Sequence, residues 1–224
     1  MNTPFTVQQF FEAFTRYNQA VWPMQVVLYL LAAVLIRVAA RGGRSSGPRV
    51  GAGLAFLWAW MGAVYHWGFF TVVNPVAWIF GALFVVQAIL FLLVAIVARR
   101  LSFHWRFDAF GVTGAALMTY ALVLYPLLGA LAGHGYPRGP TFGLPCPTTI
   151  FTFGLLLWSE REVPLWVLAV PLGWSILGVS AAASFGIVED YALPVAGVLS
   201  GVMILWKNRD LQSSEAIEAA RTPA

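Results

Sequence analysis

The chain has 224 residues, of which 60% are hydrophobic and only 10% are charged. Soluble domains carry about 25% charged residues, so this composition indicates a polytopic membrane protein and leaves no room for a separate soluble domain. The net charge of +4 does not indicate nucleic-acid binding, because the basic residues lie in loops between apolar segments. The single cysteine, Cys146, excludes an internal disulfide and a metal cage of several cysteines.

The first segment, residues 3–19, predicts a short amphipathic helix, with the helix itself over residues 5–19. Thr6-Val-Gln-Gln9 has the pattern of a capping box, in which two side chains satisfy free amides at a helix start. Aromatic residues recur at helical spacing and form one face: Phe10, Phe11, Phe14 and Tyr17. We interpret the segment as an anchor that lies in the membrane interface. A lid over the outer mouth of the protein is the alternative.

Seven apolar segments follow, and they predict an all-α, seven-helix transmembrane domain over residues 1–210. The segments cover residues 22–40, 50–70, 76–98, 109–131, 148–158, 163–183 and 191–206. All except the fifth have the length of an ordinary membrane span. Residues 211–224 predict a polar cytoplasmic tail.

The basic residues predict the orientation of these spans. One set of loops and span ends holds Arg37, Arg41, Arg44, Arg49, Arg99, Arg100, Arg106, Arg161, Lys207, Arg209 and Arg221. The other set holds only Arg16 and Arg138. Because cytoplasmic loops carry the excess of Lys and Arg, the N-terminus is predicted outside and the C-terminus in the cytoplasm.

The fifth apolar segment is the unusual one, because 11 helical residues span only about 16 Å. The proline-rich stretch over residues 135–145 must then dip into the membrane, where irregular backbone needs burial or water. Pro147 suits a first helical turn, and Thr148 and Thr149 suit the helix start. The free amides of such a start attract polar solutes, so we predict a polar cavity here. The alternative is a short helix tucked among longer ones, with a structural loop above it.

Several chemically versatile side chains fall on the predicted outer side and form the candidate solute site. Its residues are Tyr65, His66, His134, Cys146, Thr148, Thr149, Glu189 and Asp190. Metal binding by His66, His134 and Cys146 is a weaker alternative, since these ligand types suit zinc or copper. A further alternative is catalysis in which Cys146 is a nucleophile activated by His66 or His134. Glu189 and Asp190 also suit a helix start without any functional role.

The chain resembles a family of uncharacterised bacterial multi-pass membrane proteins that is known only as a domain of unknown function. The similarity lies in Pro4-Phe-Thr-Val-Gln-Gln-Phe-Phe, Tyr17-Asn18, Val21-Trp22-Pro23, Tyr65-His66-Trp67, Asn74-Pro75 and Gly143-Leu-Pro-Cys-Pro-Thr-Thr-Ile-Phe-Thr-Phe-Gly154. It implies a multi-pass protein of the bacterial inner membrane. It implies no activity and assigns no functional residue.

These features lead to three hypotheses about function. The first is a small-solute transporter or channel with an outward-facing polar pocket at the start of the fifth span. The second is a sensor, scaffold or accessory protein without a pathway, in which polar side chains such as Gln87, Thr119, Tyr120 and Ser175 are paired between helices. The third is an outer-leaflet membrane enzyme or metal-binding protein. The expected partners are the lipid bilayer and a small solute or ion.

Overall fold

The computed structural model describes residues 5–221 and is built from helices, with no strand among those residues. Thr3 and Pro4, at the start of the predicted first segment, lie outside the described residues. The last three residues of the predicted tail also lie outside them. The α-helices are α1 (Val7–Ala20), α2 (Met24–Arg41), α3 (Ser46–Trp60), α4 (Ala77–Leu92), α5 (Ala109–Thr119), α6 (Tyr125–Leu131), α7 (Pro145–Leu157), α8 (Ala169–Phe185) and α9 (Ala192–Arg221). Short π- and 3-10-helical turns extend or join them: η1 (Met61–Trp67), η2 (Phe70–Val72), η3 (Leu93–Val97), η4 (Tyr120–Leu124), η5 (Leu165–Leu168) and η6 (Val188–Tyr191).

Five helical runs within the described residues are long and apolar enough to cross a membrane. They are Met24–Arg41, Ala77–Val97, Ala109–Leu131, Leu165–Phe185 and Val188–Ser214. They match the first, third, fourth, sixth and seventh predicted spans closely, although the seventh continues well beyond residue 206. The second predicted span forms α3 and η1, whose glycines, tryptophans and His66 make it less apolar. Of the seven predicted spans, five are therefore confirmed as helices that are long and apolar enough to cross a membrane.

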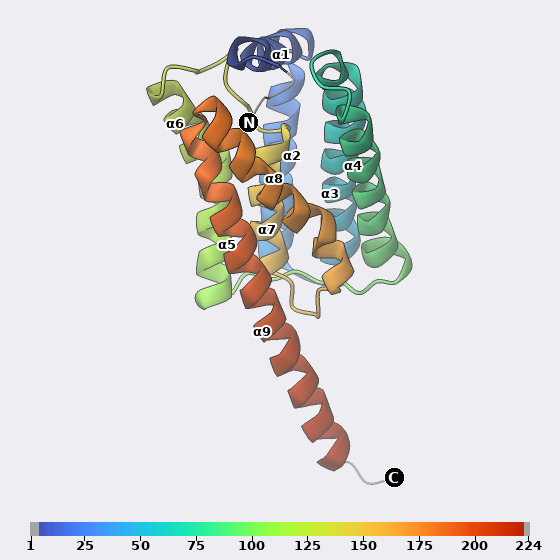
Figure 1. Cartoon of the computed structure of the whole chain (residues 1–224). Helices are drawn as coiled ribbons and strands as arrows, with labels where there is room; N and C mark the ends of the chain where they lie inside the picture. The colour runs from blue at the N-terminus through green and yellow to red at the C-terminus, as the bar shows by residue number, and fades with distance from the viewer. Residues whose placement is uncertain (1–4, 222–224) are drawn as a thin grey trace.

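The short helix α7 lies inside the protein, between α5, α8 and α9 (Figure 1). Every residue from 147 to 157 is buried. It approaches α5 closely, because Gly114 faces Gly154 and a Cβ on Gly154 would lie 2.7 Å from the Gly114 carbonyl oxygen. The indole of Trp58 in α3 donates a hydrogen bond of 3.1 Å to Thr152 Oγ1. The helix thus has protein rather than lipid around it, as the alternative of a tucked short helix predicts.

The N-terminal helix α1 crosses one end of the helical bundle, and the loops that join α2 to α3 and α4 to α5 lie at the other (Figure 1). The predicted capping box is present, since Gln9 N donates to Thr6 Oγ1 and Thr6 N donates to Gln9 Oε1. The predicted aromatic face packs inward: Phe10, Phe14 and Tyr17 are buried.

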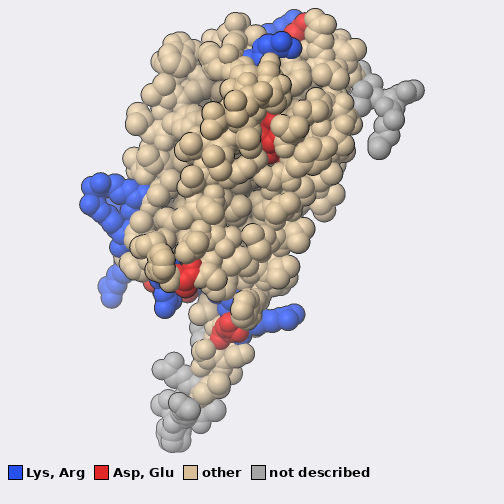
Figure 2. Space-filling view, turned by 90° about the vertical axis from the view of Figure 1, so that its left-hand side faces the viewer, with Lys and Arg blue, Asp and Glu red and all other residues tan. Residues whose placement is uncertain are grey.

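Lys and Arg side chains gather toward the two ends of the molecule, and between them the visible face is mostly uncharged apart from a small acidic patch (Figure 2). The helices expose many apolar side chains, among them Leu30 on α2, Ile79 on α4 and Val202 on α9. An exposed apolar surface of this extent suits contact with lipid. The residues predicted as a polar tail continue α9 as a helix to Arg221, beyond the end of the bundle (Figure 1).

Candidate functional site

A cavity of about 220 Å³ lies beneath α1, beside the start of α7. Its walls come from segments far apart in the sequence, including α1, η1, α7, α8 and η6. Nearly half of the residues that line it are aromatic: Phe5, Phe10, Phe14, Tyr65, Phe70, Phe80, Tyr125, Trp174 and Phe185. The cavity is therefore a small aromatic chamber that only the tertiary structure assembles.

The aromatic face of α1 closes this chamber from above. The rings of Phe10 and Phe185 stack with centroids 4.4 Å apart, and Phe14 stacks on Tyr65 at 5.9 Å. Tyr65 in turn stacks on Phe70 at 5.5 Å. Such contacts add to the area that each ring buries. The helix thus lies in the position of a lid.

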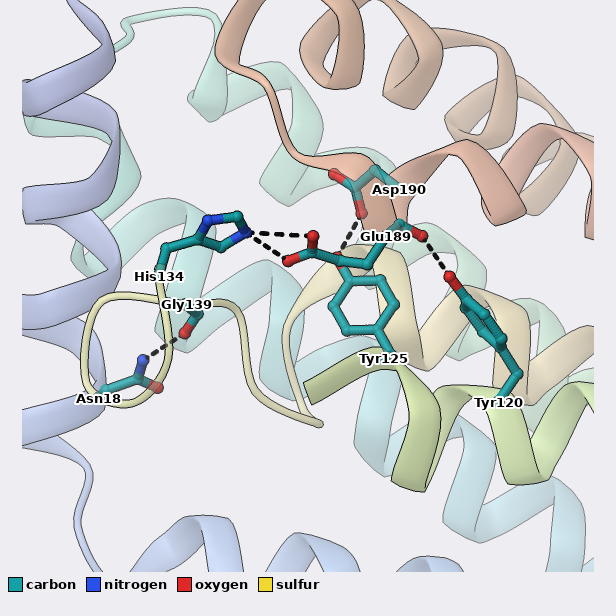
Figure 3. Close-up of polar contacts among 7 residues, drawn as sticks. All are labelled: Asn18, Tyr120, Tyr125, His134, Gly139, Glu189 and Asp190. Atoms are coloured by element: carbon teal, nitrogen blue, oxygen red, sulfur yellow. Dashed lines mark hydrogen bonds and ion pairs between the residues drawn. The ribbon is translucent and has the colours of Figure 1, made fainter. Parts of the chain in front are cut away.

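The polar part of the wall centres on Asp190, which is buried in η6. The Tyr125 hydroxyl donates a hydrogen bond to Asp190 Oδ1 (Figure 3). The Cys146 thiol, at the start of α7, also lies against the Asp190 carboxyl group. Among the described residues that line the cavity, Asp190 is the only one with a carboxyl group, and none is Lys or Arg.

His66 is the second polar feature of the wall, and its hydrogen-bonding groups are unused. The side chain is fully buried, and neither ring nitrogen has a hydrogen-bond partner. Aromatic rings surround it, with Phe84 at 4.8 Å and Trp174 at 5.4 Å between centroids. The indole nitrogen of Trp174 has no oxygen or nitrogen partner, and its N–H lies against the Cys146 thiol. Because burial of unpaired polar groups costs free energy, a polar molecule in the cavity would offset the cost at His66.

His134 and Glu189, which the sequence also assigns to the pocket, form a buried pair beside the cavity. His134 Nε2 lies 2.9 Å from Glu189 Oε1 and 3.1 Å from Oε2 (Figure 3). The Tyr120 hydroxyl donates to the Glu189 carbonyl oxygen at 2.8 Å. Neither His134 nor Glu189 lines the cavity. The pair connects the loop after α6 to η6, and so holds the turn that carries Asp190.

Asn18 holds α1 on the loop between α6 and α7, a role that the sequence does not reveal. Its Nδ2 donates to the carbonyl oxygen of Pro137 at 2.7 Å and to that of Gly139 at 2.9 Å, the second of which Figure 3 shows. Its Oδ1 accepts from Thr141 Oγ1 at 2.9 Å. The only sign of this role in the sequence is that Asn18, a polar residue, lies next to Tyr17 on a helix face that is otherwise aromatic.

Tyr17 fastens the same end of α1 to α3. Its hydroxyl accepts a hydrogen bond of 2.8 Å from the indole of Trp60. Burial raises the pKa of Tyr17 to about 12, so the phenol stays protonated at neutral pH.

Thr148 and Thr149, the predicted centre of the polar pocket, are fully buried and do not line the cavity. Thr148 Oγ1 accepts a hydrogen bond of 3.0 Å from Gly143 N, and Thr148 N donates to Leu144 O. Thr149 Oγ1 has no partner. The wall at the start of α7 is instead supplied by Leu144, Pro145 and Cys146.

The metal-site alternative gains no support from this geometry. No group of three or more His, Cys, Asp and Glu side chains among the described residues is placed to hold a metal ion. His66 and Cys146 line the same cavity, whereas His134 is paired with Glu189. The thiol of Cys146 has a carboxyl group as its neighbour, and no hydrogen bond to a histidine is present.

The described residues form an all-helical protein with five helices long and apolar enough to cross a membrane, and a small, partly open aromatic chamber lies at one end of its helical bundle. The chain belongs to a family described as "Family of unknown function (DUF6064)", whose model matches residues 7–215. Neither the curated proteins nor the solved structures contain a match to the chain.

Proposed function

We propose that this protein is an integral membrane protein that binds a small solute in the chamber under α1. His66 carries the proposal, because it is fully buried, lines the chamber and has two ring nitrogens without a partner. A residue that served only to fill the core would favour an apolar side chain of similar size at this position. Histidine is therefore better explained as a contact for a bound molecule.

The first form of this proposal is a sensor or accessory protein that binds its solute without moving it across the membrane. The pairing of polar side chains inside the bundle favours it. Gln87 Nε2 donates to the Val167 carbonyl oxygen at 2.9 Å, while its Oε1 has no partner, and the Tyr120 hydroxyl donates to the Glu189 carbonyl oxygen. Polar groups that are paired between helices stabilise the bundle and leave no lining for a pathway.

Transport is the second form, and a different observation favours it. A second recess of about 230 Å³ lies at the other end of α7, lined by Leu157, Trp158 and Lys207 among others. The short helix α7 thus has one recess at each end. A movement of α7 that joined the two recesses would open a route for a small solute.

We also propose seven spans in a bacterial inner membrane, with the chamber at the outer side. Arg16 and Arg138 belong to the end of the bundle that α1 covers. The segments around residues 41–49 and 99–106, which hold more Arg residues, are at the opposite end. This asymmetry supports an outer N-terminus by the positive-inside rule.

The test of binding uses Cys146, which is the only cysteine and lines the chamber. The rate at which methyl methanethiosulfonate modifies Cys146 is measured with and without a panel of small amines, alcohols, carboxylates and sugars. We expect one class to slow the reaction in the natural protein and to have no effect in a His66→Leu variant. The variant should unfold at a higher temperature than the natural protein, because it no longer buries unpaired nitrogens.

A lower unfolding temperature for His66→Leu, together with unchanged protection by solutes, would contradict the proposed role of His66. Uptake of the protecting solute into proteoliposomes then separates the two forms of the proposal. Concentration-dependent uptake above that of empty liposomes indicates transport. Binding without uptake indicates a sensor or accessory protein.

A further inference from the structure

We infer that the chamber accepts a small organic ammonium compound that also carries an oxygen atom, such as an amino alcohol. This inference rests on the proposed solute-binding function and names the class of solute. Three properties of the wall lead to it: the sign of its charge, the chemistry of its aromatic faces and the inventory of its unused hydrogen-bonding groups.

The charge of the wall favours a cation. Asp190 is the only carboxyl group on the wall among the described residues, and no Lys or Arg side chain there opposes it. The second carboxyl group nearby, Glu189, is paired with His134. An anion in this chamber would meet a buried carboxyl group with no cation to balance it, which disfavours carboxylates and phosphates.

The aromatic faces favour an ammonium group over an inorganic cation. Phe10, Tyr65, Trp174 and Phe185 belong to the wall, where Phe10 stacks on Phe185 and Trp174 lies edge-to-face with His66. An ammonium group close to several aromatic faces is attracted by the negative potential above each ring. A small divalent cation would instead favour several carboxylate ligands, and Asp190 is the only carboxyl group on the wall among the described residues. The volume of about 220 Å³ limits the ligand to a small molecule or a headgroup.

The unused hydrogen-bonding groups require an oxygen atom on the ligand. A neutral histidine has one donor and one acceptor, and both are unpaired in His66. The indole N–H of Trp174, which has only the weakly accepting Cys146 thiol beside it, is a further donor for that oxygen atom. A hydroxyl group both donates and accepts, so an amino alcohol satisfies groups that a simple alkylammonium would leave unpaired.

The test compares choline with 3,3-dimethylbutan-1-ol, which has the same shape and hydroxyl group but no charge. Protein in lipid-free detergent is titrated with each compound, and protection of Cys146 from methyl methanethiosulfonate reports binding. We expect choline to bind at least about tenfold more tightly, from the combined cation–π and carboxylate attraction. In an Asp190→Asn variant, whose side-chain oxygen still accepts from Tyr125, this preference should fall to about twofold or less.

A Glu189→Gln variant is the matched control. It removes the same charge one residue away, outside the chamber, and its amide oxygen can still bond to His134. We expect it to keep the preference for choline. An equal loss in both variants would overturn the assignment of Asp190 as the cation contact.

Equal protection by the two compounds would overturn the ammonium inference while solute binding survived. Protection by neither, and by no member of the wider solute panel, would remove the solute-binding proposal itself. Protection in phosphatidylcholine nanodiscs but not by free choline would support the same ligand chemistry and assign it to a lipid headgroup.

Discussion

Lys207 Nζ donates hydrogen bonds to the carbonyl oxygens of Leu157 and Ser159, at 2.8 and 2.7 Å. Leu157 is the last residue of α7, so a cation from α9 satisfies carbonyl groups at the end of the buried central helix. In the sequence, Lys207 is only one of the basic residues that end an apolar segment. The structure adds a second role, in which it completes the packing of α7.

Replacement of Lys207 by Met should lower the free energy of unfolding by about 1.5–3 kcal/mol, because two charge-assisted hydrogen bonds are lost. Reversible unfolding in detergent micelles measures this change. Arg209→Met, which removes an exposed charge from the same helix, should change it by less than about 0.5 kcal/mol. Equal losses in the two variants would show that Lys207 acts only as a surface charge.

The pair His134–Glu189 offers a second test. His134→Ala leaves a fully buried carboxyl group without its partner, and should cost about 3–5 kcal/mol. The double variant His134→Ala/Glu189→Ala should cost less than the sum of the two single changes, because no charge is left unpaired. Thermal unfolding of the four proteins in one detergent completes the cycle. Strict additivity would argue against a coupled pair.

Asn18 is expected to keep the chamber closed. Asn18→Leu removes the bonds to Pro137, Gly139 and Thr141, each worth about 1 kcal/mol, and so loosens α1 from the loop below it. We expect bulky maleimides to modify Cys146 at least about tenfold faster in this variant. Gln8→Leu, on the exposed side of α1, is the control and should leave the rate unchanged. A rate that does not rise in Asn18→Leu would mean that α1 is not the barrier.

The contact between α5 and α7 predicts opposite effects for two glycine substitutions. Gly154→Ala places a methyl group 2.7 Å from both the Gly114 carbonyl oxygen and Met118 Cγ, and should destabilise the protein by about 1–3 kcal/mol. Gly173→Ala in α8 meets no atom within 4 Å, and should stabilise the helix by up to about 1 kcal/mol. Melting temperatures of the two variants check both signs together. A tolerated Gly154→Ala would show that the two helices can separate at little cost.

The elements that could be predicted are those that depend on neighbouring residues. The capping box at Thr6 and Gln9, the aromatic face of α1 and the five long apolar helices follow from local spacing and hydropathy. The shortness of α7 was also visible, although its helix begins at Pro145 rather than at Thr148. Proline is tolerated in a first turn because its missing amide has no partner there, so the two prolines lie inside the helix start.

The sequence by itself thus determined the helices, their hydropathy and the set of polar residues at one end of the bundle. Only the tertiary structure decided which of these polar residues lie together. Cys146 and Asp190 line the chamber with Tyr65 and His66, Thr148 and Thr149 are buried away from it, and His134 pairs with Glu189. The physical reason is that a helix forms through contacts three or four residues apart, whereas a chamber forms where distant segments pack.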